Sequence, residues 1–145
     1  VHGIPLDEME RTAECEHAGP RMRATTCRIW GRVDGAVGGM ASWYVTFSTW
    51  LGRSGIWLED LFVSPVHRGS GLGTAMLARL AELCAERGYG RLEWWVLRWN
   101  TPSIGFYDSI GGQPMDDWLT YRLDGHALQA LAALDRTVST PGIED

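Results

Sequence analysis

The sequence predicts a single α/β (α+β) domain in which helices flank a mixed sheet. Three observations predict it: a hairpin signal near residue 34, a long amphipathic pattern in the middle of the chain, and strand patterns on both sides of that pattern. A chain of 145 residues is long enough for one domain with a sizeable core. We expect one domain over 1–145, divided into an N-terminal region (1–25), a core (26–123) and a C-terminal helix and tail (124–145).

The strand patterns begin with a meander. Thr26–Val33 and Val37–Thr49 are predicted to pair through Asp34-Gly35, because this dipeptide favours a two-residue hairpin turn. Ile56–Val63 is predicted as a strand whose apolar end is buried on both faces. Two further strands are predicted over Arg91–Trp99 and Trp118–Leu123.

The helix with the clearest pattern is Thr74–Arg87. Its apolar residues recur at helical spacing, and Gly88 follows in the position that ends many helices. Shorter helices are predicted over Leu6–Cys15, Pro102–Ser109 and His126–Leu134, and a loop over Glu14–Arg23.

Composition excludes some classes of function. A net charge of −5 argues against nucleic-acid binding, which normally requires a basic face. No apolar run reaches the length of a membrane span, and the first residues are too polar for a signal peptide. Cys15, Cys27 and Cys84 lack metal-ligand spacing, so we expect structural thiols in a reduced, cytoplasmic protein without a metal.

A glycine-rich turn separates the third predicted strand from the long helix. It reads Arg68-Gly69-Ser70-Gly71-Leu72-Gly73, and glycines let backbone N–H groups approach a ligand closely. The helix that follows adds its unpaired N–H groups and the positive end of its dipole, which suits a pyrophosphate. The spacing differs from the dinucleotide-binding G-x-G-x-x-G, and no Gly-Lys-Ser/Thr is present. An ordinary turn without a ligand is the alternative.

The segment "LFVSPVHRGSGLGTAML" resembles the acyl-CoA-binding motif of the GCN5-related N-acetyltransferases, with Arg68, Gly71 and Gly73 filling its pattern. "WYVTFSTWLGRSGIWLEDLFV" and "EWWVLRWNTPSIGFY" are similar to the spermidine/spermine acetyltransferase branch, so that the resemblance covers about Gly38 to Leu123. It implies a mostly antiparallel, twisted sheet with a splayed central strand pair, and acetyl-CoA as cosubstrate.

The resemblance also implies the residues that bind coenzyme A. Main-chain groups of the strand before the turn would pair with the pantetheine arm, and the turn would surround the pyrophosphate. Asn100 matches a position that holds the pantetheine arm, and a helix N-cap two residues before Pro102 is nearly as good a physical explanation for it. The implied residues are Leu61, Phe62, Val63, Arg68, Gly69, Ser70, Gly71, Leu72, Gly73, Thr74, Asn100 and Ser103.

Two residues match catalytic positions of the resembling enzymes. Tyr107 matches the general acid for the departing thiolate, a role that suits a phenol with a pKa of about 10. Glu59 matches the acid that receives the substrate amine, whose deprotonation at pH 7 costs about 4–5 kcal/mol. Asp60 ranks below Glu59, because regular strand alternation would point it to the opposite face. The implied substrate-binding residues are Glu59, Asp60, Glu93 and Asp116, with Asp117 equally near.

The resemblance is incomplete upstream of the hairpin, where only about twenty-five residues precede the first core strand. The usual strand and two helices that build part of the acceptor wall do not fit in that length. Either a second subunit supplies the missing wall, or the site is more open, or the chain is incomplete. Dimerisation is common in the resembling enzymes and would cover exposed apolar surface, so we expect a homodimer. The predicted function is acetyl transfer to a primary amine of a small cationic substrate by direct attack. The alternative is a weak or inactive module that binds acyl-CoA or dimerises.

Overall fold

The computed structural model describes residues 14–17 and 25–134 of the chain. These residues divide into two compact units, with the boundary between Gly111 and Gly112. The first unit carries the sheet and most of the predicted site. The second unit contains one helix, α3 (Gly125–Ala132).

The sheet of the first unit has five strands in the order β1-β2-β3-β4-β5. Neighbours from β1 to β4 are antiparallel, and β5 is parallel to β4. This mixed, mostly antiparallel sheet confirms the predicted fold class. The strand bounds are β1 (Glu14–His17), β2 (Thr25–Val33), β3 (Ala36–Ser48), β4 (Arg53–Val63) and β5 (Leu92–Trp94).

The hairpin between β2 and β3 turns at the predicted dipeptide. Asp34 and Gly35 both have positive φ, at 51° and 79°. A two-residue loop with positive φ at both positions is the turn whose twist matches that of the flanking strands. The hairpin prediction is therefore confirmed in both position and geometry.

A β-bulge interrupts the pairing of β3 with β4. Ser42 lies opposite Asp60, but the next residue along β3, Trp43, lies opposite Leu58, which leaves Glu59 without a partner in the register. An extra residue of this kind shifts the alternation of side chains between the two faces of the strand. Consequently, the two acids of Leu-Glu-Asp do not obey regular strand alternation.

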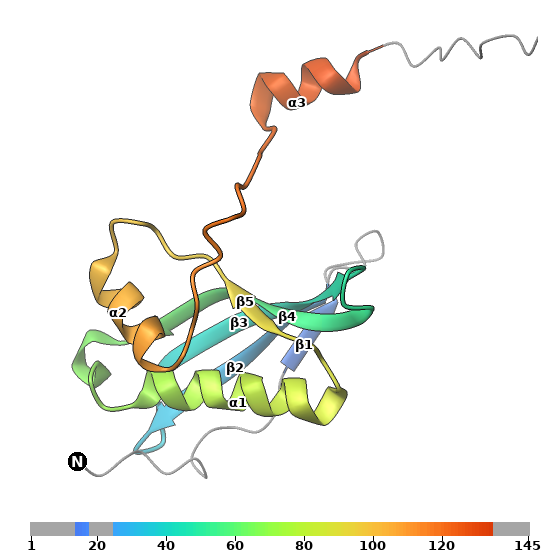
Figure 1. Ribbon diagram of the computed structural model, residues 1–145. Helices are drawn as coiled ribbons and strands as arrows, with labels where there is room; N and C mark the ends of the chain where they lie inside the picture. Colours follow the sequence, from blue (N-terminus) through green and yellow to red (C-terminus); the bar gives the residue numbers. More distant parts are fainter. Residues whose placement is uncertain (1–13, 18–24, 135–145) are drawn as a thin grey trace, which may run out of the picture. The chain divides into compact units, whose positions relative to one another are not determined.

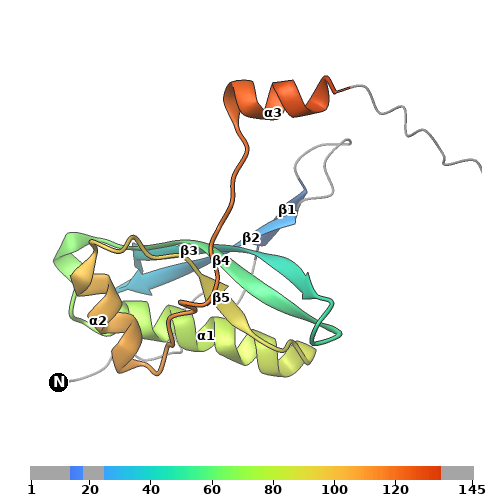
Figure 2. The ribbon, with the colours of Figure 1, turned by 45° about the horizontal axis from the view of Figure 1, so that its top comes forward.

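The helix α1 (Leu72–Arg87) runs along one face of the sheet, as Figures 1 and 2 show. Burial of apolar side chains between helix and sheet drives this packing. The helix lies very close to both β2 and β3: a Cβ added at Gly31 on β2 would lie 2.7 Å from Leu72 Cδ1, and one added at Gly39 on β3 would lie 2.9 Å from Met76 Cε. The buried core consists of Cys27, Ile29, Ala41, Trp43, Ile56, Leu58, Leu72, Met76, Leu77, Leu80, Leu83 and Cys84.

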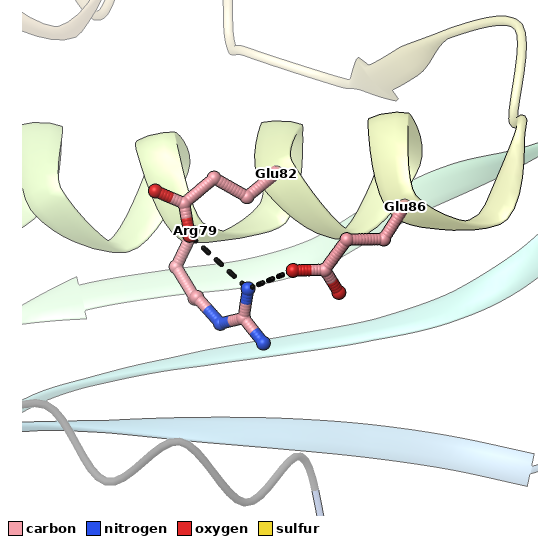
Figure 3. Close-up of polar contacts among 3 residues, drawn as sticks. All are labelled: Arg79, Glu82 and Glu86. Carbon is pink, nitrogen blue, oxygen red and sulfur yellow. Dashed lines mark hydrogen bonds and ion pairs between the residues drawn. The ribbon is translucent and has the colours of Figure 1, made fainter.

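Away from the core, α1 carries a small ion-pair network (Figure 3). Arg79 Nη1 lies 3.1 Å from Glu82 Oε2 and 3.0 Å from Glu86 Oε1. Both carboxylates are more than half exposed, so the network contributes little to the free energy of unfolding. It marks this side of α1 as the solvent side and leaves the opposite side to the core.

Several predicted elements differ in the structure. The strand predicted over Arg91–Trp99 is shortened to β5, and Trp118–Leu123 is not a strand, because it has no neighbouring strand among the described residues. The helix predicted over Leu6–Cys15 and the loop predicted over Glu14–Arg23 are wrong where described, since Glu14–His17 is a strand. The remaining residues of those two predictions lie outside the described part of the chain.

The other helices begin close to their predicted starts. α1 starts two residues before the predicted Thr74, and α2 covers Thr101–Ser109. The prediction of reduced thiols is wrong for Cys27, which is disulfide-bonded. Among the described helices, none has the length and apolar character that crossing a membrane requires.

Candidate active site

The glycine turn lies between β4 and the first turn of α1. Gly69 and Gly71 have φ of 76° and 92°, a region that residues with a Cβ rarely adopt. A Cβ at either position would meet no other atom within 4 Å, so the space above the turn is open. The turn therefore keeps both the conformation and the clearance that a phosphate ligand needs.

The start of α1 supplies N–H donors to that open space. Gly71 is the N-cap, and the Ala75 N–H donates to the Gly71 carbonyl at 2.9 Å. The preceding amides, those of Leu72, Gly73 and Thr74, belong to the first turn, where an α-helix offers no internal acceptor. The Leu72 side chain is fully buried, so this residue can offer a ligand only its backbone.

Hydrogen bonds from Arg68 and Ser70 stabilise the conformation of the turn. The Ser70 hydroxyl donates to the His67 carbonyl, and Arg68 Nε donates to the Val63 carbonyl at 3.2 Å. A Cβ at Gly73 would lie 3.5 Å from Phe106 and 3.6 Å from Val63. The turn, the end of β4 and the helix α2 thus meet at one place, beside the N-terminal end of α1 (Figures 1 and 2).

Beyond Leu58 and Trp94, β4 and β5 are no longer paired, and we call the resulting gap in pairing along residues 59–63 the opening. Their parallel pairing covers only Ile56–Leu58 with Leu92–Trp94. From Asp60 to Val63, β4 pairs with β3 on one side and with no described strand on the other. The backbone of Leu61, Phe62 and Val63 therefore borders this opening, apart from the Val63 carbonyl that Arg68 already uses.

The helix α2 begins with a side-chain cap. Asn100 Oδ1 accepts a hydrogen bond from the Ser103 N–H at 3.4 Å, and Pro102 occupies the first turn. The capping role of Asn100 is thus confirmed. The amide NH₂ of Asn100 takes no part in this cap.

Tyr107, on α2, packs against β5. Its ring centroid lies 4.9 Å from that of Trp94, which is itself packed against the core beneath the sheet. Burial raises the pKa of the Tyr107 phenol above its ordinary value. Tyr107 is therefore protonated at neutral pH, as a proton donor must be.

Glu59 and Asp60 both lie on the other face of the sheet, away from α1. Asp60 Oδ2 accepts from Ser42 Oγ at 2.8 Å, and Ser42 alternates with the core residues Ala41 and Trp43. Glu59 Oε2 accepts from Trp57 Nε1 at 3.0 Å. The prediction that Asp60 points to the opposite face from Glu59 is wrong, because the bulge at Glu59 shifts the alternation.

The other two predicted substrate residues occupy different surroundings. Glu93 lies opposite Trp57 in the register of β5, and its Oε2 lies 2.7 Å from Arg91 Nε. Glu93 thus already has an ion-pair partner on the same strand face. Asp116 and Asp117 belong to the second unit.

Sequence reasoning missed two aromatic residues near Glu59, namely Tyr44 and Trp57. Tyr44 lies opposite Trp57 in the β3–β4 register, and the rings of Trp57 and Trp95 are in contact. Burial first, and then the negative charge of Glu59, raises the pKa of Tyr44. The available signal was the alternation of Trp57 with Glu59 along one strand, which places both on one face.

Cys84 is a free, buried thiol on α1. Its Sγ donates to the Arg91 carbonyl at 3.7 Å, and burial is the main cause of a raised pKa. A thiol that is buried and protonated is a poor nucleophile. Among the described residues, no group of His, Cys, Asp and Glu side chains could hold a metal ion.

The sequence of this chain matches a known family of transferases. The model of the acetyltransferase (GNAT) family matches residues 5–111. Curated relatives include L-ornithine N5-acetyltransferase NATA1 of Arabidopsis thaliana, 34% identical over 70% of this chain, and thialysine N-epsilon-acetyltransferase of Mus musculus, 35% identical over 65%. The chain belongs to the GNAT family of acetyltransferases.

The chain spans about half the length of these two relatives, 45% and 56% respectively. Among solved structures, an integron cassette protein from the mobile metagenome of V. cholerae matches with a TM-score of 0.69 and 26% identity, covering 79% of this chain and 70% of that one. AAC(6')-Iy, solved with a CoA-based bisubstrate analogue, matches with a TM-score of 0.59 at 19% identity, over 69% and 70% of the two chains. The second likeness concerns the fold alone.

Proposed function

We propose that this chain is an acetyl-CoA-dependent N-acetyltransferase that acts on a primary amine of a small cationic substrate. The observation that carries the proposal is the opening between β4 and β5, which has Glu59 at one face of the sheet and Tyr107 on the α1 side. Membership of the GNAT family and the glycine turn at the end of β4 support acetyl-CoA as the donor.

The glycine turn and the opening bind the acetyl donor, acetyl-CoA. The amides of Leu72, Gly73 and Thr74, together with Arg68, hold the diphosphate of coenzyme A. The pantetheine arm follows the free side of β4, as if it were an added strand. The thioester is thereby aimed through the opening, towards the face that carries Glu59.

The acceptor half begins with an ammonium ion at Glu59. The carboxylate binds the ammonium and accepts its proton, directly or through water, because only the neutral amine is a nucleophile. The amine nitrogen attacks the thioester carbonyl, and a backbone N–H near Phe62 or Val63 stabilises the oxyanion. Collapse of the tetrahedral intermediate breaks the C–S bond, and Tyr107 donates a proton to the departing thiolate. The attacking nitrogen loses its surplus proton through water, which restores the phenol and leaves the neutral amide.

The substrate class is narrowed by the named activities of the relatives. The two curated relatives described above are named for ornithine N5 and thialysine N-epsilon, amines on the side chains of amino acids. A further relative is named spermidine/spermine N(1)-acetyltransferase-like protein 1. Diamines, polyamines and lysine-like amino acids are therefore the acceptors to screen first, followed by aminoglycosides.

The test is thiol release from acetyl-CoA in the presence of each amine. Release that depends on one of these amines, and that falls at least tenfold in Glu59→Gln, supports the proposal. Glu82→Gln, which changes an exposed carboxylate on α1, is the matched control and should leave the rate unchanged. Tight binding of coenzyme A without any amine-dependent release would instead identify a coenzyme A-binding module.

We also propose that the protein is a homodimer. The second unit exposes Trp118, Leu119 and Tyr121 by 75%, 73% and 91%, and burying such side chains is a common role of a subunit interface. Light scattering on a sizing column should give twice the monomer mass of 16.1 kDa. A monomeric mass at micromolar concentration would overturn this part of the proposal.

A further inference from the structure

Three aromatic rings lie beside Glu59 on the face of the sheet opposite α1, which also carries Asp60 and, as the register partner of Trp57, Glu93. Tyr44 and Trp57 are cross-strand partners on β3 and β4, and Trp57 Nε1 donates to Glu59 Oε2 at 3.0 Å. The ring of Trp95, in the segment after β5, lies 4.8 Å from that of Trp57. We call Tyr44, Trp57, Glu59 and Trp95 the aromatic corner.

The two indoles of the aromatic corner meet nearly at right angles. Their interplanar angle is 81°, so the rings form two adjacent walls. Trp95 is 63% exposed and Tyr44 is 37% exposed, although large aromatic side chains are usually well buried. The corner therefore presents aromatic surface to solvent.

Glu59 is fixed at the edge of this surface. Its Oε2 is committed to Trp57, whereas its Oε1 accepts no hydrogen bond from the described part of the chain. Aromatic faces attract cations through the ring quadrupole, and a nearby carboxylate adds a full negative charge. An alkylammonium satisfies both, since its N–H groups reach the free oxygen while its methylene groups contact the rings.

We propose that Tyr44, Trp57 and Trp95 bind an ammonium group of the acceptor amine beside Glu59, and that Trp57 holds the Glu59 carboxylate in position. This inference rests on the proposed function and assigns the residues that select its substrate. Trp57 is thus a positioning residue, because it acts through Glu59. Tyr44 and Trp95 determine specificity for positively charged acceptors.

The first test measures cation binding without any reaction. Tetramethylammonium chloride is titrated into the full chain, with sodium chloride at equal ionic strength as the reference, and the indole N–H signals are followed by NMR. The Trp57→Phe and Trp95→Leu variants assign the two signals. We expect tetramethylammonium to shift both signals in the wild-type protein, and Trp95→Leu to weaken its binding about 2-fold to 30-fold.

The matched control is Phe47→Leu. Phe47 is 64% exposed and lies three residues after Tyr44 on β3. Because side chains alternate between the two faces of a strand, Phe47 points to the opposite face from Tyr44. This variant should bind tetramethylammonium as the wild type does. Indole signals that do not respond to tetramethylammonium in the wild type would overturn the inference, whatever the enzyme activity.

The second test separates positioning from folding. Trp57→Phe keeps an aromatic ring but removes the N–H that holds Glu59, so kcat should fall while the KM for acetyl-CoA stays the same. Trp95→Leu should raise the KM for the amine with little change in kcat. A variant that changed both substrates' KM values equally, with a lowered Tm, would reveal a merely structural role and would contradict the inference.

The two proposals fail in different ways. If tetramethylammonium binds at the corner but no amine releases thiol, the acetyltransferase function is wrong and the cation site remains. If an amine releases thiol but the corner variants leave its KM and kcat unchanged, the function remains and the corner is not the acceptor site.

Discussion

The ring of Tyr107 lies against that of Trp94, with the centroids 4.9 Å apart and the planes inclined by 47°. This contact joins α2 to β5 at the last residue of β5 that pairs with β4. It therefore anchors the proposed general acid at the point where the two strands part. The burial that comes with this contact is also the cause of the raised pKa of Tyr107.

Replacing Tyr107 by Phe should lower turnover by about tenfold to a thousandfold, because the departing thiolate loses its proton donor. The ring contact with Trp94 is retained, so coenzyme A affinity and Tm should change little. Turnover is measured by thiol release, and affinity by calorimetry. Tyr89→Phe, at another half-buried tyrosine, is the control. Turnover in Tyr107→Phe equal to that of the wild type would exclude Tyr107 from the mechanism.

The raised pKa of Tyr107 also predicts how stability depends on pH. The folded state binds the phenolic proton more tightly than the unfolded state, whose tyrosine pKa is about 10. The contribution of this group is therefore complete below pH 10 and is lost as pH rises through the folded pKa. Between pH 9 and pH 11, the Tm of Tyr107→Phe should fall less steeply than that of the wild type. Parallel slopes would contradict the burial of the phenol.

Two glycines at opposite ends of α1 allow a matched test of the phosphate turn. Gly71 and Gly88 have φ of 92° and 66°, and a Cβ at either would meet nothing within 4 Å. Gly71→Val and Gly88→Val therefore impose similar backbone strain, but only Gly71 borders the proposed diphosphate site. Calorimetry should show coenzyme A affinity lowered at least tenfold in Gly71→Val and unchanged in Gly88→Val. Equal affinities would place the diphosphate elsewhere.

The sequence was sufficient to predict the turns and helices whose conformation is set by their own residues. Asp34-Gly35 specifies its turn through backbone preferences, and the apolar spacing of Leu72–Arg87 specifies a buried helix face. A strand forms only where a neighbouring strand is available for hydrogen bonding. The period-2 pattern of Trp118–Leu123 does not show whether such a neighbour is present. For the same reason β5 is shorter than its apolar run.

The same distinction between local and non-local residues applies to the candidate site. The turn from Arg68 to Gly73 is contiguous with the strand before it and the helix after it, and this local context favoured a phosphate site over an ordinary turn. The acceptor face is assembled across strands, where the bulge at Glu59 decides that Asp60 shares a face with Trp57. A register shift between two strands leaves no mark in either strand's sequence, and Asp60 was therefore assigned to the wrong face.

Asn100 offers a last test, which separates its role as a cap from a role in binding. Its Oδ1 accepts the Ser103 N–H at the start of the helix that carries Tyr107. Asn100→Ala should therefore cost about 0.5–2 kcal/mol of stability, whereas Asn100→Asp keeps an acceptor oxygen and should retain the Tm. Both variants lose the amide NH₂, the group left for the pantetheine arm. If that group binds the arm, the KM for acetyl-CoA rises about tenfold in both variants. A KM that rises only in Asn100→Ala would mean that Asn100 serves the site through the helix cap alone, by keeping Tyr107 in place.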